Sequence, residues 1–130
     1  MPLILARELA ANLATPMFLL DARGWLVFYN DAAAGLIGRP FAELGEIPAS
    51  EFHAVLETSL PDGTALDRHD TPVGVAYYTQ LPAHGRLVCK TYDGVKRSIE
   101  NTAYPLFGAT GEMHGVVSVF WELGDTEHAG

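Results

Sequence analysis

The 130-residue sequence has little positive charge: eight lysines and arginines stand against 16 aspartates and glutamates, and the formal net charge is −8. Proteins that bind DNA or RNA use clustered lysine and arginine side chains to neutralise phosphates. The cations here are scattered along the chain. We therefore predict that the protein does not bind nucleic acid.

Cysteine and long apolar runs are also scarce. Cys89, the single cysteine, cannot form an internal disulfide, so the fold needs no oxidising compartment. The uncharged run at residues 9–20 is far shorter than the roughly 20 residues of a membrane-spanning helix. Arg7 and Glu8 interrupt the apolar N-terminus, and no basic segment precedes it as a secretion signal requires. We expect a cytoplasmic protein without a membrane segment.

The sequence lacks the usual motifs of catalysis. It has no Gly-x-Ser-x-Gly turn, no His-Glu-x-x-His pair and no glycine-rich phosphate loop. Ser98 and Ser118 are expected to point outward from strands. An acid–base pair of Asp67 with Tyr77 or Tyr78 is conceivable, but no spacing favours it. We therefore expect a protein that is not an enzyme.

The sequence does contain enough apolar residues for one folded domain, with 48% hydrophobic and 18% charged residues. Leu5, Leu9 and Leu13 recur every four residues, which predicts an N-terminal helix that Thr15-Pro16 terminates. The predicted organisation is a flanking helix at 1–14, a domain at 15–123 and a polar tail at 124–130.

Within the domain, short strands and helices alternate with turns rich in glycine and proline. Asn30 or Asp31 is expected to cap a short helix, and Thr71 or Asp70 a second helix that begins at Pro72. The last third has the composition and turn spacing of strands. The expected strands are 17–21, 25–30, 85–92, 96–106 and 112–123. This order predicts an α+β fold, an antiparallel sheet with helices on one side.

The order and spacing of these elements resemble the PAS family of sensor domains over most of the chain. The residues that carry the resemblance are Leu19–Asp21, Gly24–Asn30, Ala33, Gly38, Asp62-Gly63, Thr71–Val73, Ala76, Asp93-Gly94, Lys96-Arg97, Tyr104–Leu106, Gly111 and Gly115. The resemblance implies a PAS-like five-stranded antiparallel sheet in the order 2-1-5-4-3, with short helices on one face and an N-terminal flanking helix. It also implies a sensory role in signal transduction. The last strand runs into a polar tail without the family's usual exit sequence, so we expect a separate partner signalling protein.

Members of this family have a cavity between sheet and helices, and side-chain alternation along the strands predicts what lines it. The predicted cavity residues are Phe18, Leu20, Leu87, Cys89, Ile99, Asn101, Val117 and Val119. All but Asn101 are apolar, which favours a small apolar ligand. Asn101 either bonds backbone or water, or anchors the polar group of a ligand, because an unpaired buried amide costs about 1–3 kcal/mol.

The same resemblance predicts which cofactors the chain could bind. Flavin-binding members hold the flavin ring through two asparagines and a glutamine, whose positions correspond here to Cys89, Ile99 and Val117. None of these three can make the polar contacts, so flavin is not expected.

Haem-binding members use a histidine on or after the long helix, and haem through His84 or His69 is an alternative. Asp67, His69 and Asp70 carry metal-ligand groups. We interpret Asp70 as a helix cap and the other two as loop surface, and we expect no metal and no other cofactor.

The apolar N-terminal stripe is expected to pack on the sheet face that points away from the cavity. A helix of about a dozen residues is marginal alone, and monomers rarely keep a large exposed apolar patch. We predict a homodimer whose interface comprises Leu5, Leu9, Leu13, Met17, Leu19, Val116 and Phe120. The alternative is that the helix folds back on its own sheet.

The sequence therefore leaves three functions open. The favoured one is a PAS-type sensory domain that binds a small apolar ligand and dimerises. The second is a protein–protein interaction module with a filled core, and the third is a small enzyme.

Overall fold

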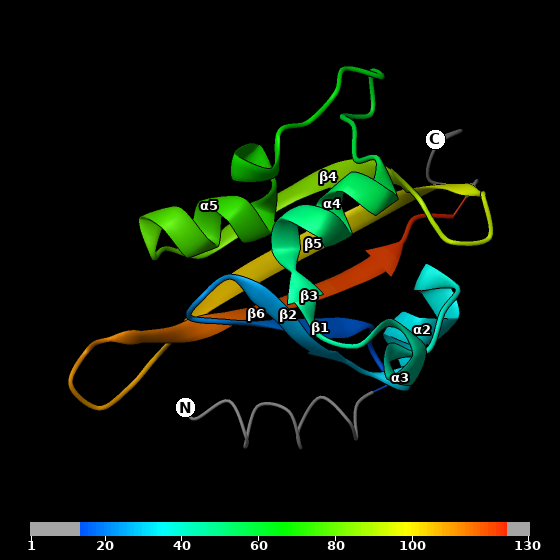
Figure 1. Cartoon of the computed structure of the whole chain (residues 1–130). Helices are drawn as coiled ribbons and strands as arrows, with labels where there is room; N and C mark the ends of the chain where they lie inside the picture. Colours follow the sequence, from blue (N-terminus) through cyan, green and yellow to red (C-terminus); the bar gives the residue numbers. More distant parts are fainter. Residues whose placement is uncertain (1–13, 125–130) are drawn as a thin grey trace.

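The computed structural model describes residues 14–124, which fold into a curved antiparallel sheet and short helices (Figure 1). The predicted helix at 1–14, with Leu5, Leu9 and Leu13, and the tail from residue 125 onward lie outside the described residues. The elements are β1 (Met17–Asp21), β2 (Trp25–Tyr29), α2 (Asp31–Ile37), α3 (Phe41–Leu44), β3 (Ile47–Pro48), α4 (Ala49–Leu56), the 3-10 helix η1 (Arg68–Asp70), α5 (Pro72–Thr79), β4 (Ala83–Lys90), β5 (Lys96–Phe107) and β6 (Met113–Glu122).

The sheet has six strands in the order β3-β2-β1-β6-β5-β4, and every neighbouring pair is antiparallel. The five strands predicted from the sequence are present in the predicted order, so the α+β, PAS-like fold class is confirmed. The sixth strand is β3, a two-residue segment that pairs with Trp25 and Leu26 of β2 at the sheet edge. Two residues are too few to show side-chain alternation, so the sequence could not reveal this strand.

The helices gather on one face of the sheet. Figure 1 shows α4 and α5 above that face, with α2 and α3 beside the end of β1 and β2. We call the face under α4 and α5 the inner face and the opposite one the outer face. Within residues 14–124, no helix combines the length and apolar character needed to cross a bilayer.

Side chains at the predicted helix starts hold the helices in place. Asn30 accepts a hydrogen bond from the Ala33 amide at 2.9 Å, as the predicted cap should, and also from the Met17 amide at 3.1 Å. Its amide nitrogen donates to the Thr15 carbonyl at 2.8 Å, so this buried side chain ties the start of β1 to α2. At α5, Thr71 is the cap, and its hydroxyl accepts from the Gly74 amide at 3.0 Å. Asp70 is therefore not the cap.

The register between β1 and β6 corrects the predicted side-chain directions on the last strand. Leu19 pairs with Val117 and Met17 with Val119, whereas Leu20 pairs with Val116. Directly opposite residues share a sheet face, and Leu20 lies on the inner face. Val117 and Val119 therefore lie on the outer face, and their prediction as cavity residues is wrong.

The same one-residue error on β6 affects two predicted interface residues. Val116 and Phe120 are buried on the inner face, so they cannot lie on an interface at the outer face. Ser118 lies between them, inward and with 0% of its surface exposed, although the predicted strand alternation placed it outward. Its hydroxyl is accommodated there because Asn101 donates a hydrogen bond to it. Met17 and Leu19 do lie on the outer face, as predicted.

Candidate ligand cavity

A cavity of about 330 Å³ lies between the inner face of the sheet and the helices α4 and α5. Six of the eight predicted residues line it: Phe18, Leu20, Leu87, Cys89, Ile99 and Asn101. They come from β1, β4 and β5, where the predicted inward parity agrees with the structure. On β6, Phe120 supplies the wall in place of the two valines.

The helices contribute lining residues that the strand-based reasoning missed. Phe52 and Leu56 lie one turn apart on α4, and Val73 and Tyr77 lie one turn apart on α5. Spacing of four residues places two side chains on one helix face. The signal was therefore present in the sequence, as two apolar pairs at helical spacing.

Aromatic rings form the part of the wall near β1. The ring of Phe18 lies 5.6 Å from that of Phe52 in an edge-to-face arrangement and 5.8 Å from that of Phe120. Tyr29 stacks on the other side of Phe52 at 6.4 Å, and its hydroxyl donates to the Arg39 carbonyl. Burial, followed by the nearby Tyr92 phenol, raises the pKa of Tyr29 to about 12, so it stays neutral. The rings of Phe18, Phe52 and Phe120 line the cavity from β1, α4 and β6, and Tyr29 of β2 packs behind Phe52.

Cys89 contributes a buried thiol to the cavity wall. Burial raises its pKa from 9.0 to about 11, and the nearby Arg97 guanidinium offsets only part of that effect. A thiol is nucleophilic only as the thiolate. Cys89 therefore acts here as a small apolar wall residue.

The exposed lining residues show where the cavity meets solvent. Arg23 and Arg68, both exposed, lie at this opening together with Tyr77 and Tyr78. Arg23 pairs with Asp21 at 2.7 Å, while the Arg68 guanidinium lies 3.4 Å from the Tyr78 hydroxyl. The Tyr77 hydroxyl donates to the carbonyl oxygen of Ala22 at 2.7 Å, which links α5 to the β1–β2 turn across the opening.

Asn101 is the polar residue at the floor of the cavity, and 4% of its surface is exposed. Its amide nitrogen donates to the Ser118 hydroxyl at 2.7 Å and to the Val119 carbonyl at 3.0 Å. The amide group is thus bonded to its own sheet, as one of the two sequence-based alternatives expected. Among residues 14–124, no donor is bonded to its oxygen, Oδ1.

Comparison with known proteins adds a second line of evidence on the fold. No protein-family model matches the sequence, and no curated protein is similar to it. The PAS domain of the fruit-fly ELK potassium channel aligns over 93% of this chain and 96% of its own, with a TM-score of 0.73 and 13% identity. The PAS domain of Bordetella pertussis BvgS aligns over 98% and 90%, with a TM-score of 0.67 and 16% identity. The chain has the PAS fold. The fungal blue-light photoreceptor Vivid, in its light-state dimer, aligns over 85% and 79%, with a TM-score of 0.67 and 16% identity.

The structure places the three positions of this PAS fold that were compared with flavin contacts. Cys89 and Ile99 line the cavity, as expected. Val117 lies on the outer face, so the predicted correspondence on β6 was displaced by one residue. The inward neighbours there are Val116, which is apolar, and Ser118, which is bonded to Asn101.

Neither histidine considered as a haem ligand lines the cavity. His84 lies on the outer face of β4, where its ring bonds Thr102 at 2.6 Å and Glu100 at 2.9 Å. His69 stands in η1, half exposed, with its ring 2.8 Å from Asp67. Neither can ligate a group held inside the cavity.

The histidine that does line the cavity is His53 of α4, which the sequence reasoning did not consider. Its Nε2 lies 3.0 Å from the Leu66 carbonyl and also contacts the Thr58 hydroxyl. These contacts tie α4 to the segment before η1.

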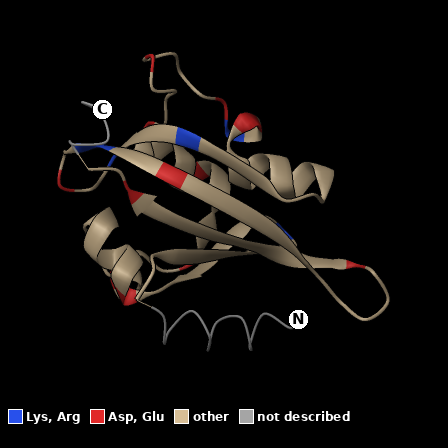
Figure 2. Ribbon diagram, turned by 180° about the vertical axis from the view of Figure 1, so that it is seen from behind, with Lys and Arg blue, Asp and Glu red and all other residues tan. Residues whose placement is uncertain are grey.

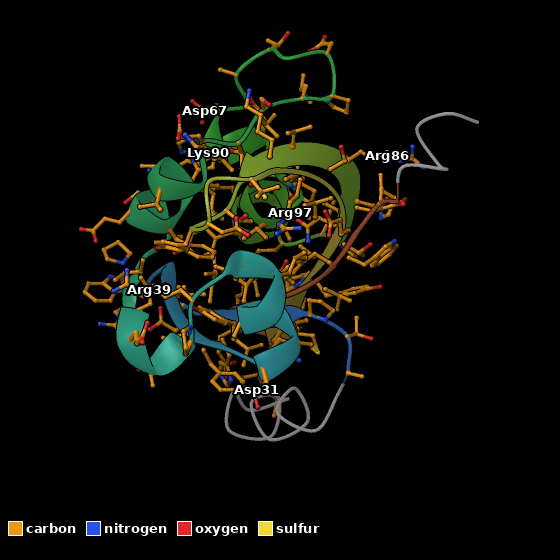
Figure 3. The ribbon with its side chains drawn as sticks, turned by 90° about the vertical axis from the view of Figure 1, so that its right-hand side faces the viewer. Asp31, Arg39, Asp67, Arg86, Lys90 and Arg97 are labelled. Atoms are coloured by element: carbon orange, nitrogen blue, oxygen red, sulfur yellow. The ribbon has the colours of Figure 1, made fainter. Side chains whose placement is uncertain are left out.

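The acidic residues near η1 have structural partners. Asp67 caps η1 by accepting the His69 amide at 2.9 Å, and this bond lowers the pKa of the carboxyl group. Figure 3 shows Asp67 beside the loop that precedes η1. Within the described part of the chain, no cluster of three or more His, Cys, Asp or Glu residues is placed to hold a metal ion.

Proposed function

We propose that this chain is a sensory PAS module that holds a small, largely apolar ligand between its sheet and its helices. The observation that carries the proposal is the cavity of about 330 Å³ with a mostly apolar wall. This volume falls within the roughly 300–1,000 Å³ of known ligand pockets. The structural neighbours support a signalling context, since one is part of a potassium channel and another is a photoreceptor.

The size of the cavity itself favours an occupant. At about 30 Å³ per water molecule, the space corresponds to roughly 11 waters. Most of its wall cannot hydrogen-bond to them, because it consists of side chains such as Leu87, Ile99 and Phe120. Replacing such waters with an apolar ligand is favourable. The ligand would also stabilise the fold, by about 2.7 kcal/mol at 100 times its dissociation constant.

The test of this proposal is native mass spectrometry of the purified chain compared with the same sample denatured. An added mass that disappears on denaturation supports a bound ligand. If no mass is retained, a panel of neutral apolar compounds is screened by thermal shift, and binders should raise the melting temperature by several degrees. A protein that retains no mass and responds to no compound would favour the interaction module with a filled core.

We propose that the ligand is not a flavin, and the polar groups of the cavity wall support this proposal. The polar edge of a flavin needs donors and acceptors together. Cys89, Ile99 and Val116 offer neither at the corresponding positions, and the donors of Asn101 are already bonded within the sheet. We also propose that the module has no catalytic role. Without flavin or haem, the purified protein should be colourless. A stoichiometric flavin or haem absorbance band would overturn the proposal that neither cofactor is bound.

Self-association is a second proposed property, and the outer face of the sheet supports it. Tyr104 and Trp121 project from this face with 45% and 41% of their surfaces exposed, beside Val117 and Val119. In Figure 2, charged residues on this side lie on β4 and β5, whereas the middle of β6 is uncharged. Met17 and Leu19 of the predicted interface are only 6% and 1% exposed in the single chain, so Tyr104 and Trp121 are the better candidates for contacting a second copy. Vivid, a structural neighbour, is described as a light-state dimer.

Sedimentation of the full chain tests this second proposal. A homodimer should become monomeric in Trp121→Glu, whereas Glu100→Gln, on the residue paired with Trp121, should leave the dimer intact. A compact monomer for the unmodified chain at micromolar concentration would refute it.

A further inference from the structure

The hydrogen bonds of Asn101 fix which end of its amide faces the cavity. The Val119 carbonyl oxygen can only accept a hydrogen bond. The amide nitrogen of Asn101 must therefore face Val119, as it does at 3.0 Å. Its second hydrogen is directed to the Ser118 hydroxyl at 2.7 Å. Both donors are thus used inside the sheet.

The oxygen of the same amide is left without a protein partner. No donor from residues 14–124 bonds Oδ1. In the same part of the chain, every fully buried side-chain nitrogen or oxygen has a hydrogen-bond partner. Because Oδ1 has no such partner, it is not fully buried, and it contacts the open space of the cavity that Asn101 lines. Asn101 itself is 96% buried, so this oxygen is a buried acceptor without a protein donor, next to apolar wall residues such as Ile99 and Phe120.

The cavity floor offers no charge to complement an anion. The cationic lining residues, Arg23 and Arg68, are both exposed at the opening. Arg97 lies near Cys89, but its guanidinium is held by Asp93 at 2.7 Å and by Glu122 at 3.1 Å (Figure 3). A carboxylate placed at the floor would meet the Asn101 oxygen with no cation beside it, which is unfavourable because a desolvated charge needs a partner.

We propose that the cavity selects a neutral, largely apolar molecule with one O–H or N–H group, which donates a hydrogen bond to Oδ1 of Asn101. Phenols, indoles, alcohols and primary amides belong to this class, whereas carboxylates, ethers and hydrocarbons do not. Without a ligand, water occupies the acceptor, and the ligand's donor replaces that water. This inference rests on the proposed ligand-binding function and adds the polarity of the ligand to it.

The test compares three probes of one shape: 2-naphthol, which donates, its methyl ether 2-methoxynaphthalene, which cannot, and 2-naphthoate, which is charged. Dissociation constants are measured by calorimetry on the full chain. We expect 2-naphthol to bind about tenfold or more tightly than the ether, because the ether leaves the buried acceptor unsatisfied. The naphthoate should bind most weakly.

Two variants assign the preference to this residue. Asn101→Leu removes the acceptor at similar size, and the naphthol-to-ether ratio should fall to about one. Ser118→Ala keeps the acceptor, because the Val119 bond still orients the amide, and should preserve the ratio. If Asn101→Leu fails to fold, the comparison of probes on the unmodified chain still decides.

The outcomes separate this inference from the proposed function. Equal binding of 2-naphthol and its ether, or a preference for the naphthoate, overturns the inference and leaves a ligand-binding cavity. A naphthol preference that survives Asn101→Leu assigns the acceptor to another residue and also overturns it. Absence of binding by all three probes counts against the cavity as a ligand site and against the inference with it.

Discussion

Exchanging one apolar residue for glutamine on each face of the sheet tests where the cavity lies. Ile99 is buried on the inner face of β5 and lines the cavity, whereas Val117 is half-buried on the outer face of β6. Ile99→Gln and Val117→Gln introduce the same amide on adjacent strands. We expect only Ile99→Gln to weaken the binding of an apolar probe.

The structure gives the size of the effect. A glutamine at Ile99 places an amide in the wall, where a bound probe would strip its water at a cost of about 1–3 kcal/mol. At 1.4 kcal/mol per factor of ten, binding should weaken by roughly 5- to 150-fold. Val117 does not touch the cavity, so its variant should bind within about twofold of the unmodified protein, since surface changes typically shift energies by less than about 0.5 kcal/mol.

The assay is a fluorescence titration with N-phenyl-1-naphthylamine, a neutral apolar dye that carries one N–H donor. Urea unfolding of both variants is run in parallel. Ile99→Gln should also lower the free energy of unfolding by about 1–3 kcal/mol, because the amide is buried in the folded state. Unchanged dye affinity in folded Ile99→Gln, or loss of affinity in Val117→Gln alone, would show that the cavity is not where we place it.

Three further predictions concern individual residues. At pH 8, Cys89 should react with iodoacetamide about 100-fold more slowly than a free thiol, since its pKa is raised from 9.0 to about 11; a fast reaction contradicts the buried position. Gly74→Ala should lower the free energy of unfolding by about 1–3 kcal/mol or more, because the new Cβ would lie 2.0 Å from the Arg68 carbonyl oxygen. Gly85→Ala, whose Cβ would meet its nearest atom at 3.5 Å, is the control, and urea unfolding that ranks the two in reverse order is the adverse result. Asp93 has a pKa of about 2, below the ordinary 3.8, because a hydroxyl, a backbone amide and a guanidinium donate to it. Its contribution to stability is present above pH 3.8 and is lost as the pH falls towards 2, so Asp93→Asn should weaken the acid dependence of unfolding in that window. An unchanged profile would argue against these bonds.

Local signals in the sequence predicted the order of the elements because each one acts over a few residues. Asn30 and Thr71 are helix caps in the structure, because the side-chain oxygen of each accepts a hydrogen bond from the amide three residues later. This contact is local and does not depend on the rest of the fold. The start of α5 at Pro72 was predicted, but the inward face of this helix was not used. The residues of the cavity wall from β4 and β5 were predicted correctly because apolar residues such as Leu87, Cys89 and Ile99 alternate there with polar or outward ones, whereas on β1, which is apolar throughout Met17–Leu20, the predicted parity was correct without such a pattern.

The last strand shows where such reasoning ends. Val116 and Val117 are both apolar, so alternation does not say which of them points inward. A shift of one residue exchanges the two faces of a strand. The predicted parity placed Val117 and Val119 inward and Ser118 outward, and the structure reverses all three. The partner of Ser118, Asn101, lies 17 residues earlier on another strand, and only the sheet register brings the two together.

The same pair explains why the cavity should discriminate between ligand donors and ligand acceptors. To donate a hydrogen bond to the carbonyl oxygen of a ligand, Asn101 would have to turn its nitrogen to the cavity and withdraw it from Ser118 and Val119. The Val119 carbonyl would then face the amide oxygen and lose its donor, and the buried Ser118 hydroxyl would have to turn and donate to that oxygen. Each unsatisfied group costs about 1–3 kcal/mol. A single new hydrogen bond to a ligand, worth about 0.5–1.5 kcal/mol, does not on average offset the loss at the Val119 carbonyl. If the cavity binds a ligand, we therefore expect the β5–β6 pairing to favour ligands that donate.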